Sequence, residues 1–260
     1  MSRPDAWAPA QYERFREERA QPFYDLMRMV KVASPQTAVD LGCGTGELTA
    51  VLHRHVRATS TIGVDSSEAM LERARALGIH SLQFVNADIA EWWPPAPLDL
   101  IFSNAALHWV PDHVTLFGRL REMLRPEGEL AVQMPANFDH ISHIVATEVA
   151  RESPFSDALG GYVRVAPVLA PEAYALLLHS LGFAAQDVRL QVYAHTLEST
   201  AAVVEWVKGS LLTDYAVRMP DALYTQFVEQ YRARLLEVLG DQRPYFYAFK
   251  RILIWARTPS

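Results

Sequence analysis

Asp40-Leu41-Gly42-Cys43-Gly44-Thr45-Gly46 is the stretch of this sequence that decides the fold. It ends a short apolar segment, residues 38–41, that is typical of a β-strand, and it precedes residues 47–55, which have helical spacing. The three glycines let the main chain turn sharply and let a ligand approach where side chains would clash. The first amide groups of the helix are free to bind that ligand. The stretch therefore predicts a binding loop between the first strand and the first helix of an α/β domain.

Strands and helices alternate along the chain beyond this loop. We expect strands at residues 61–64, 82–85, 98–102 and 129–134, with helices at 67–77 and 113–124. A helix at 171–181 precedes a strand at 188–195, and a last strand lies at 246–256. Such alternation indicates parallel strands with right-handed crossovers. The predicted fold class is α/β: a doubly wound, mostly parallel seven-stranded Rossmann-like sheet.

The chain divides into an expected core and additions to it. Residues 1–35 are predicted to form an N-terminal helical arm, in which Pro22 separates two short helices. Residues 36–136 form the α/β core, closed by the helix and strands of 171–198 and 241–260. About 50 residues separate the last two strands, where a hairpin turn would suffice. We therefore expect residues 137–170 and 199–240 to form a helical cap over the carboxyl ends of the strands.

The bulk composition excludes several classes of protein. The 260 residues are 50% hydrophobic and carry a formal net charge of -6, which suits one globular domain with an elaboration and argues against a general nucleic-acid binder. Charged residues interrupt every apolar stretch before the roughly 20 residues that a membrane span needs. The N-terminus has no signal-peptide pattern, and Cys43 is the single cysteine. We expect a soluble cytoplasmic protein that binds neither nucleic acid nor membrane.

The residue at position 47 narrows the range of ligands that the loop can bind. A dinucleotide-binding loop would place its third glycine there, but this chain has Glu47, which repels a diphosphate. The loop instead favours a ligand with ammonium and sulfonium charges, for which Asp40 is the nearest carboxylate. An NAD-dependent oxidoreductase is disfavoured for this reason.

Two further carboxylates follow neighbouring strands. Asp65 ends the second strand about twenty residues beyond the loop, where it can accept both hydroxyls of a ribose; the alternative is a helix N-cap. Asp88 follows the third strand, where it can accept a hydrogen bond from an adenine amino group; the alternative is turn chemistry. Met70 and Ile89 are then placed against the faces of the adenine ring.

These residues resemble the class I S-adenosylmethionine-dependent methyltransferases, which carry an acidic-Leu-Gly-x-Gly-x-Gly loop and acidic residues after the second and third strands. The resemblance implies S-adenosyl-L-methionine as the cofactor. Tyr12 of the arm is expected to close over it, unless that ring only packs in the core. The expected cofactor-binding residues are Tyr12, Asp40, Gly42, Gly44, Gly46, Asp65, Ser66, Met70, Asp88, Ile89, Asn104, Ala105 and Leu107.

Within that class the chain is similar to the trans-aconitate 2-methyltransferase family over nearly its full length. The family has Pro and Asn where this loop has Thr45 and Glu47. The matching segments are Trp7-x-Pro9-x-x-Tyr12, residues 63–67, residues 98–105, Trp109-x-Pro111-Asp112-His113, residues 130–135 and residues 251–257.

The resemblance implies transfer of a methyl group to a carboxylate oxygen of a small polycarboxylic acid, trans-aconitate, giving its monomethyl ester and S-adenosylhomocysteine. An ionised carboxylate is already a nucleophile, so no catalytic acid or base is expected beyond positioning and desolvation. The carboxylates of the acid need hydrogen-bond donors from the protein. Arg164 is the preferred anion clamp, and one of Lys250 and Arg251 faces the pocket. The expected substrate-binding residues are His108, Trp109, Gln133, Asn137, Tyr162, Arg164 and Arg251, with simple packing as the alternative for His108 and Trp109.

Other functions stay open on the sequence alone. They are a methyltransferase of the same fold acting on carbon or nitrogen of another metabolite, an NAD-dependent oxidoreductase, and a non-catalytic cofactor-binding protein. No metal site is expected, because nothing completes the pair His140 and His143, and Cys43 is not expected to be a nucleophile. The expected partner is a small anionic metabolite, and the oligomeric state is undetermined.

Overall fold

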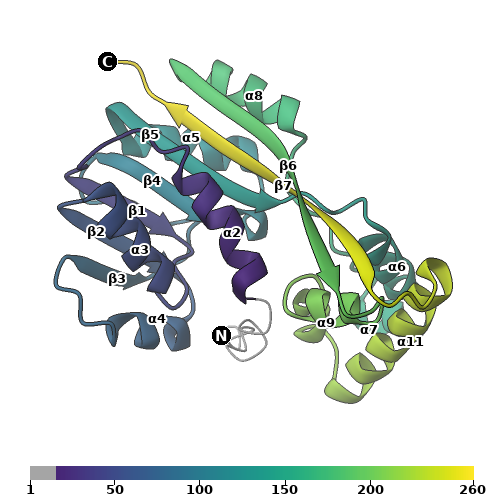
Figure 1. Ribbon diagram of the computed structural model, residues 1–260. Helices are drawn as coiled ribbons and strands as arrows, with labels where there is room; N and C mark the ends of the chain where they lie inside the picture. The colour runs from purple at the N-terminus through teal and green to yellow at the C-terminus, as the bar shows by residue number, and fades with distance from the viewer. Residues whose placement is uncertain (1–15) are drawn as a thin grey trace. The chain divides into compact units, whose positions relative to one another are not determined.

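The computed structural model describes residues 16 to 260, and these form two compact units. The α/β unit contains Arg19–Pro135, Pro167–Gln191 and Arg251–Ser260, and the helical unit contains Ala136–Ala166 and Val192–Lys250. Figure 1 labels most of the helices and strands of both. Tyr12 lies outside the described residues, so its expected contact with the cofactor stays a prediction.

One seven-stranded sheet runs through the chain in the order β3-β2-β1-β4-β5-β7-β6. The first five strands pair in parallel and β7 is antiparallel to β5, so the predicted fold class is confirmed. Both β6 and β7 contain residues of the two units. The strands are β1 (Thr37–Leu41), β2 (Ser60–Asp65), β3 (Leu82–Asn86), β4 (Leu98–Asn104), β5 (Leu124–Pro135), β6 (Ala185–Leu197) and β7 (Tyr245–Arg257).

Helices lie on both faces of the sheet in the α/β unit, with α3 in front of the strands and α5 behind them in Figure 1. This double cover explains why β4 is a continuous apolar run, since Leu100, Ile101 and Phe102 are fully buried. The helices of this unit are α2 (Arg16–Met27), α3 (Glu47–Val56), α4 (Glu68–Arg75), α5 (His113–Met123), α8 (Pro171–Ser180) and the 3-10 turn η1 (Leu107–Trp109).

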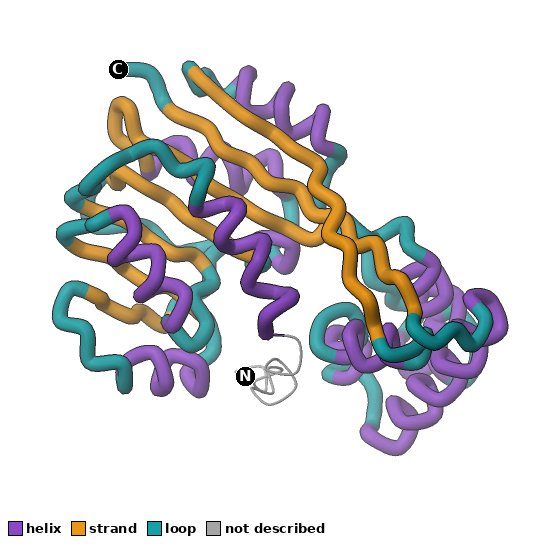
Figure 2. The backbone as a smooth tube through the Cα atoms, viewed as in Figure 1, coloured by secondary structure: helices purple, strands orange, loops and turns teal. Residues whose placement is uncertain are grey.

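The helical unit is mostly helix, purple in Figure 2, and has its own apolar core. It extends beyond residues 199–240, from Val192 to Lys250, because the ends of β6 and β7 pack with its helices: the ring centroids of Trp206 and Tyr247 lie 5.7 Å apart. Its first segment ends at Ala166, before residue 170. Its helices are α6 (Ile141–Ala150), α7 (Phe155–Leu159), α9 (Ala202–Lys208), α10 (Thr213–Ala216) and α11 (Asp221–Leu239). No helix between residues 16 and 260 combines the length and apolar character that crossing a bilayer requires.

Two local predictions were wrong. Pro22 does not divide two helices, because α2 runs through it. The missing amide bond is offset by the burial of Phe23 and Leu26. The strand predicted at residues 129–134 begins earlier, because β5 starts at Leu124 and residues 125–128 form a bulge opposite the β4 segment between Leu98 and Leu100.

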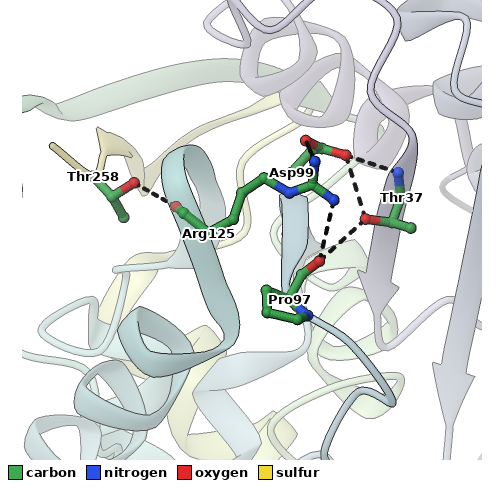
Figure 3. Close-up of polar contacts among 5 residues, drawn as sticks. All are labelled: Thr37, Pro97, Asp99, Arg125 and Thr258. Atoms are coloured by element: carbon green, nitrogen blue, oxygen red, sulfur yellow. Dashed lines mark hydrogen bonds and ion pairs between the residues drawn. The ribbon is translucent and has the colours of Figure 1, made fainter. Parts of the chain in front are cut away.

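The bulge is fixed by polar contacts at the amino ends of β1 and β4 (Figure 3). Arg125 pairs with Asp99 at 3.0 Å, and Asp99 accepts the amide hydrogen of Thr37 at 2.9 Å. Thr258 donates its hydroxyl hydrogen to the carbonyl oxygen of Arg125 at 2.7 Å. This end of the sheet is thus tied together across three strands and the segment after β7.

Candidate functional site

Glycine occurs at the three positions of the loop for different structural reasons. A Cβ atom on Gly42 would lie 2.1 Å from the Cβ of Ala106, and one on Gly46 would lie 2.8 Å from Phe84 and from Ala74. At Gly44, by contrast, φ is +54° and nothing lies within 4 Å of the Cβ position. Packing therefore requires glycine at 42 and 46, whereas Gly44 leaves open space over the main chain, where a ligand can approach.

Asp65 is fixed beside that open position. Its Oδ2 atom accepts the amide hydrogen of Gly44 at 2.9 Å, and its Oδ1 atom accepts that of Ser67 at 2.9 Å. Ser67 itself is the N-cap of α4, since its hydroxyl accepts the amide hydrogen of Met70. The helix-cap alternative for Asp65 is therefore wrong.

Asp40 is a second carboxyl group at the loop, and it is buried with 4% exposure. Burial raises the pKa of Asp40 to about 7, against the hydrogen bond that it accepts from the hydroxyl of Thr49 at 2.6 Å, and the charge of Asp65 adds to the rise. Two neighbouring carboxyl groups favour a cation nearby, as the sequence predicts. Thr49 was not predicted; its place in the first turn of α3, directly after the loop, is the signal that could have identified it.

The residues after β3 are only partly gathered at the loop. The Cδ1 atom of Ile89 lies 3.7 Å from the Cβ position of Gly42, which brings Ile89 to the glycines. Asp88 is exposed, and its Oδ1 atom accepts the amide hydrogen of Ala90, so turn chemistry is present there. Met70 is buried and Ser66 is exposed. The adenine-binding roles of these residues stay predictions.

The carboxyl ends of β4 and β5 carry two amide side chains, of which Gln133 is buried and Asn104 is half-buried. Asn104 and Gln133 are register partners, so their side chains lie on the same face of the sheet. The Oδ1 atom of Asn104 and the Nε2 atom of Gln133 have no hydrogen-bond partner among residues 16 to 260. Each such buried group costs roughly 1–3 kcal/mol, so this face is suited to a polar ligand that satisfies both.

Arg251 lies beside these amides. It is opposite Pro135 in the β5–β7 register, has 4% exposure, and its Nη1 atom is 3.5 Å from the Oε1 atom of Gln133. Its neighbour Lys250 instead forms an ion pair with Asp139 within the helical unit. Of the two cations that the sequence left open, Arg251 is the buried one, and a buried guanidinium favours a carboxylate partner.

The chain between β4 and α5 continues the same edge of the sheet. Ala105 has φ +55°, and its amide donates to the carbonyl oxygen of Gln133 at 2.9 Å. His108 is buried, with its ring centroid 5.0 Å from that of Trp109. Leu107 is fully buried, so its role at the cofactor stays a prediction. Packing, the alternative for His108 and Trp109, is thus at least part of their role.

Three predicted substrate-binding residues belong to the helical unit. Arg164 donates its amide hydrogen to the hydroxyl of Tyr215 at 3.3 Å, and burial lowers its pKa. Tyr162 donates to Asp214, a residue that the sequence reasoning missed. Asn137 accepts the amide hydrogen of Lys250 and donates to Tyr247, so a ligand would have to replace one of these bonds.

The side chains considered for metal and nucleophilic chemistry, His140, His143 and Cys43, lie in other local environments. Residues 16 to 260 contain no group of three metal-binding side chains. His140 caps α6 by accepting the amide hydrogen of Ser142, and burial lowers the pKa of His143 to about 3. Burial also raises the pKa of the Cys43 thiol, which disfavours the thiolate form.

A cavity of about 360 Å³ lies elsewhere in the α/β unit, between α2, β6 and β7. Four of its charged side chains form ion pairs, Arg28 with Asp25 and Arg189 with Asp187, and the Nζ atom of Lys31 lies 3.7 Å from the ring centroid of Trp255. The cavity includes none of the predicted site residues, so it is not the candidate site.

Comparisons with known proteins bear on this arrangement. The family described as "Methyltransferase domain" matches residues 38–128, which include the glycine loop, Asp65, Asp88 and Asn104. In solved structures, the YcgJ protein from Bacillus subtilis is 14% identical, with a TM-score of 0.62 over 92% of this chain and 99% of that one. The phosphoethanolamine N-methyltransferase 2 of Haemonchus contortus with S-adenosylhomocysteine is 17% identical, with a TM-score of 0.54 over 92% of this chain and 53% of that one. These likenesses show the fold.

Relatives at higher identity cover nearly the whole chain. The trans-aconitate 2-methyltransferase of Deinococcus radiodurans is 42% identical over 98% of this chain and 99% of its own length. The protein of the same name from Acidovorax sp. is 38% identical over 96% and 98%. These relatives favour a methyltransferase over the oxidoreductase and the non-catalytic binding protein. The chain belongs to the trans-aconitate 2-methyltransferase family, and it is a methyltransferase with S-adenosyl-L-methionine as its cofactor.

Proposed function

We propose that this enzyme transfers the methyl group to a carboxylate oxygen of trans-aconitate, releasing the monomethyl ester and S-adenosylhomocysteine. The observation that carries the proposal is the group of the half-buried Asn104 and the buried Gln133 and Arg251 at the carboxyl edge of the sheet. A guanidinium and an amide donor suit a carboxylate, whereas a carbon or nitrogen acceptor would call for a base or an acidic pocket. The names of the relatives support the same acid.

The cofactor, when bound, supplies an electrophilic methyl group on a sulfonium. The glycine loop and Asp65 are the residues proposed to hold it, because Gly44 leaves the space and the charges of Asp40 and Asp65 favour a cation. Arg251 and Gln133 are proposed to orient the acceptor through its carboxylates. Trp109 and His108 would wall the acceptor from water, so that positioning and desolvation lower the barrier without a proton transfer.

The helical unit adds proposed contacts of its own. Arg164 is a largely buried cation, and Asp214 holds the hydroxyl of the neighbouring Tyr162. We propose that Arg164 binds a further carboxylate of the acid and that Tyr162 assists it. Asn137 is a weaker candidate, because both polar ends of its side chain are engaged.

The test supplies S-adenosylmethionine labelled in its methyl group together with trans-aconitate, cis-aconitate, citrate, isocitrate or a phenolic acid. We expect label in trans-aconitate first, and we expect alkali to release it as methanol, which identifies an ester. Label that resists alkali would indicate a carbon or nitrogen acceptor. Label in none of the acids would reject the proposal.

A further inference from the structure

His113 and Tyr174 form a buried pair next to the turn that carries His108 and Trp109. The Nε2 atom of His113 lies 3.0 Å from the carbonyl oxygen of Leu107, the first residue of that turn. Its Nδ1 atom contacts the hydroxyl of Tyr174 on α8, which also accepts the amide hydrogen of Leu169 at 3.1 Å. Neither ring is exposed: His113 has 2% exposure and Tyr174 has none.

The direction of these hydrogen bonds follows from the chemistry of the groups. Burial lowers the pKa of His113, so its ring is neutral near pH 7 and donates from one nitrogen only. A carbonyl oxygen can only accept, so Nε2 carries the hydrogen and Nδ1 accepts from Tyr174. Hydrogen bonds therefore run in one direction, from Leu169 through Tyr174 and His113 to the main chain of Leu107.

The turn needs such support because its main chain is strained on both sides. Ala105 precedes it with φ +55°, and Asp112 follows it with φ +51°. A non-glycine residue in this region costs roughly 1–2 kcal/mol and persists only where its surroundings hold it. On one side Ala106 packs against Gly42, and on the other His113 holds Leu107.

We propose that His113 and Tyr174 are positioning residues for methyl transfer: they fix the turn Leu107–Trp109 and so place His108 and Trp109 beside the acceptor. This inference rests on the proposed function, which makes His108 and Trp109 neighbours of the acceptor. Both positioning residues act through the main chain of Leu107, because they are buried and the Nε2 atom of His113 contacts the carbonyl oxygen of Leu107.

The experiment compares Tyr174→Phe, His113→Gln and His113→Asn in the full-length enzyme. Tyr174→Phe keeps the ring and removes the hydroxyl. The side-chain amide of glutamine reaches the position of Nε2, whereas that of asparagine reaches only the position of Nδ1. Tyr231→Phe is the matched control, because Tyr231 is a fully buried tyrosine of the helical unit. Three quantities are measured: affinity for S-adenosylhomocysteine, kcat and KM for the acceptor, and amide hydrogen exchange of residues 105–110.

For Tyr174→Phe and His113→Asn we expect kcat/KM for the acceptor to fall by about tenfold or more, with faster exchange of residues 105–110. Affinity for S-adenosylhomocysteine should change less, within about threefold, because Leu107 is the one predicted cofactor-binding residue that His113 contacts among residues 16 to 260, whereas Asp65 and Gly44 keep their hydrogen bond. His113→Gln should recover most of the activity that His113→Asn loses, and Tyr231→Phe should match the wild type.

Three results would overturn the inference. They are unchanged acceptor kinetics in Tyr174→Phe, equal losses in His113→Gln and His113→Asn, and a loss of cofactor affinity as large as the loss of turnover. Should His113→Asn fail to fold, the milder Tyr174→Phe decides alone. If the wild type does not methylate trans-aconitate, the proposed function fails separately. Exchange of residues 105–110 then decides, because an unchanged rate in Tyr174→Phe rejects the hydrogen-bond chain whatever the acceptor.

Discussion

The two ends of the sheet in the α/β unit differ in how their polar groups are satisfied. At the carboxyl end, the buried amide atoms of Asn104 and Gln133 have no hydrogen-bond partner among the described residues, and Asp40 is a buried carboxyl group with a raised pKa. At the amino end, Asp99 accepts from Thr37 and pairs with Arg125 (Figure 3). The carboxyl end therefore contains buried polar groups whose burial is unfavourable, whereas the charged groups of the amino end are satisfied by one another.

This difference separates function from stability. Unsatisfied amides and a positive φ at Ala105 persist only because the surrounding sheet holds them, and a ligand can use them. The contacts around Asp99 lie away from the glycine loop and join β1, β4 and β5. Substitutions at the carboxyl end should therefore change binding, and those at the amino end should change only the free energy of unfolding.

The largest expected effect is the pH dependence of stability caused by Asp40. Burial raises its pKa from 3.8 to about 7, so between these values the folded protein binds more protons than the unfolded chain. The free energy of unfolding of the cofactor-free protein should fall as pH rises through this window and level off above about pH 7. The full penalty is roughly 4 kcal/mol, of which roughly 3 kcal/mol develops between pH 5 and pH 8. Urea denaturation at pH 5 and pH 8 measures it.

In Asp40→Asn, the free energy of unfolding should fall less steeply with rising pH than in the wild type. Thr49→Val should extend the decline to higher pH, because the hydroxyl of Thr49 opposes the rise in pKa. Parallel pH profiles for the wild type and Asp40→Asn would show that the carboxyl end stores no such cost.

Asp65 and Asp99 form a matched pair of carboxylates, one from each end of the sheet. Asp65→Ala should raise the Kd for S-adenosylhomocysteine by about 100-fold or more, since the carboxylate that is expected to accept two hydrogen bonds from the ribose hydroxyls is removed. Asp99→Ala should leave that Kd within about twofold and lower the free energy of unfolding by about 1 kcal/mol. Calorimetric titration and urea denaturation separate the two. Similar losses of affinity in both variants would break the comparison.

Arg251 and Arg125 give the corresponding pair of cations. Arg251→Met should raise KM for trans-aconitate about 10- to 100-fold with a smaller change in kcat, because a charge-assisted hydrogen bond to the acid is removed. Arg125→Met should leave both constants unchanged. Steady-state kinetics at saturating cofactor measure this. An unaltered KM in Arg251→Met would remove Arg251 from the proposed acceptor site.

Alanine substitution of Gly44 tests whether a ligand occupies the open space over the loop, and the same substitution of Gly182, outside the loop, is the control. Both have positive φ and nothing within 4 Å of the Cβ position, so alanine should destabilise each by roughly 1 kcal/mol. Only Gly44→Ala should also raise the Kd for S-adenosylhomocysteine, by about tenfold, because its methyl group would occupy the ligand's space. Equal affinities in the two variants would mean that no ligand passes over Gly44.

The carboxyl end of the sheet could be predicted from the sequence better than the amino end. The loop and the double-covered strand β4 have local signatures: regularly spaced glycines and a continuous apolar run. The pairing of Asn104 with Gln133 depends on the register between β4 and β5, which no local pattern encodes. The bulge at residues 125–128 and the hydrogen bond from Thr49 also come from tertiary contacts. Such contacts decide which polar groups stay unsatisfied, and the sequence alone does not show this.

The smallest expected effect tests the amino end alone. Thr258 is buried, and its hydroxyl donates to the carbonyl oxygen of Arg125 inside the bulge of β5. Thr258→Val keeps the shape of the side chain and leaves that carbonyl without this donor, so the free energy of unfolding should fall by about 1 kcal/mol. Cofactor affinity and kcat should not change, because the bulge lies at the far end of β5 from Gln133. A fall in kcat without a loss of stability would show that the amino end influences the reaction, and the division between the two ends would no longer hold.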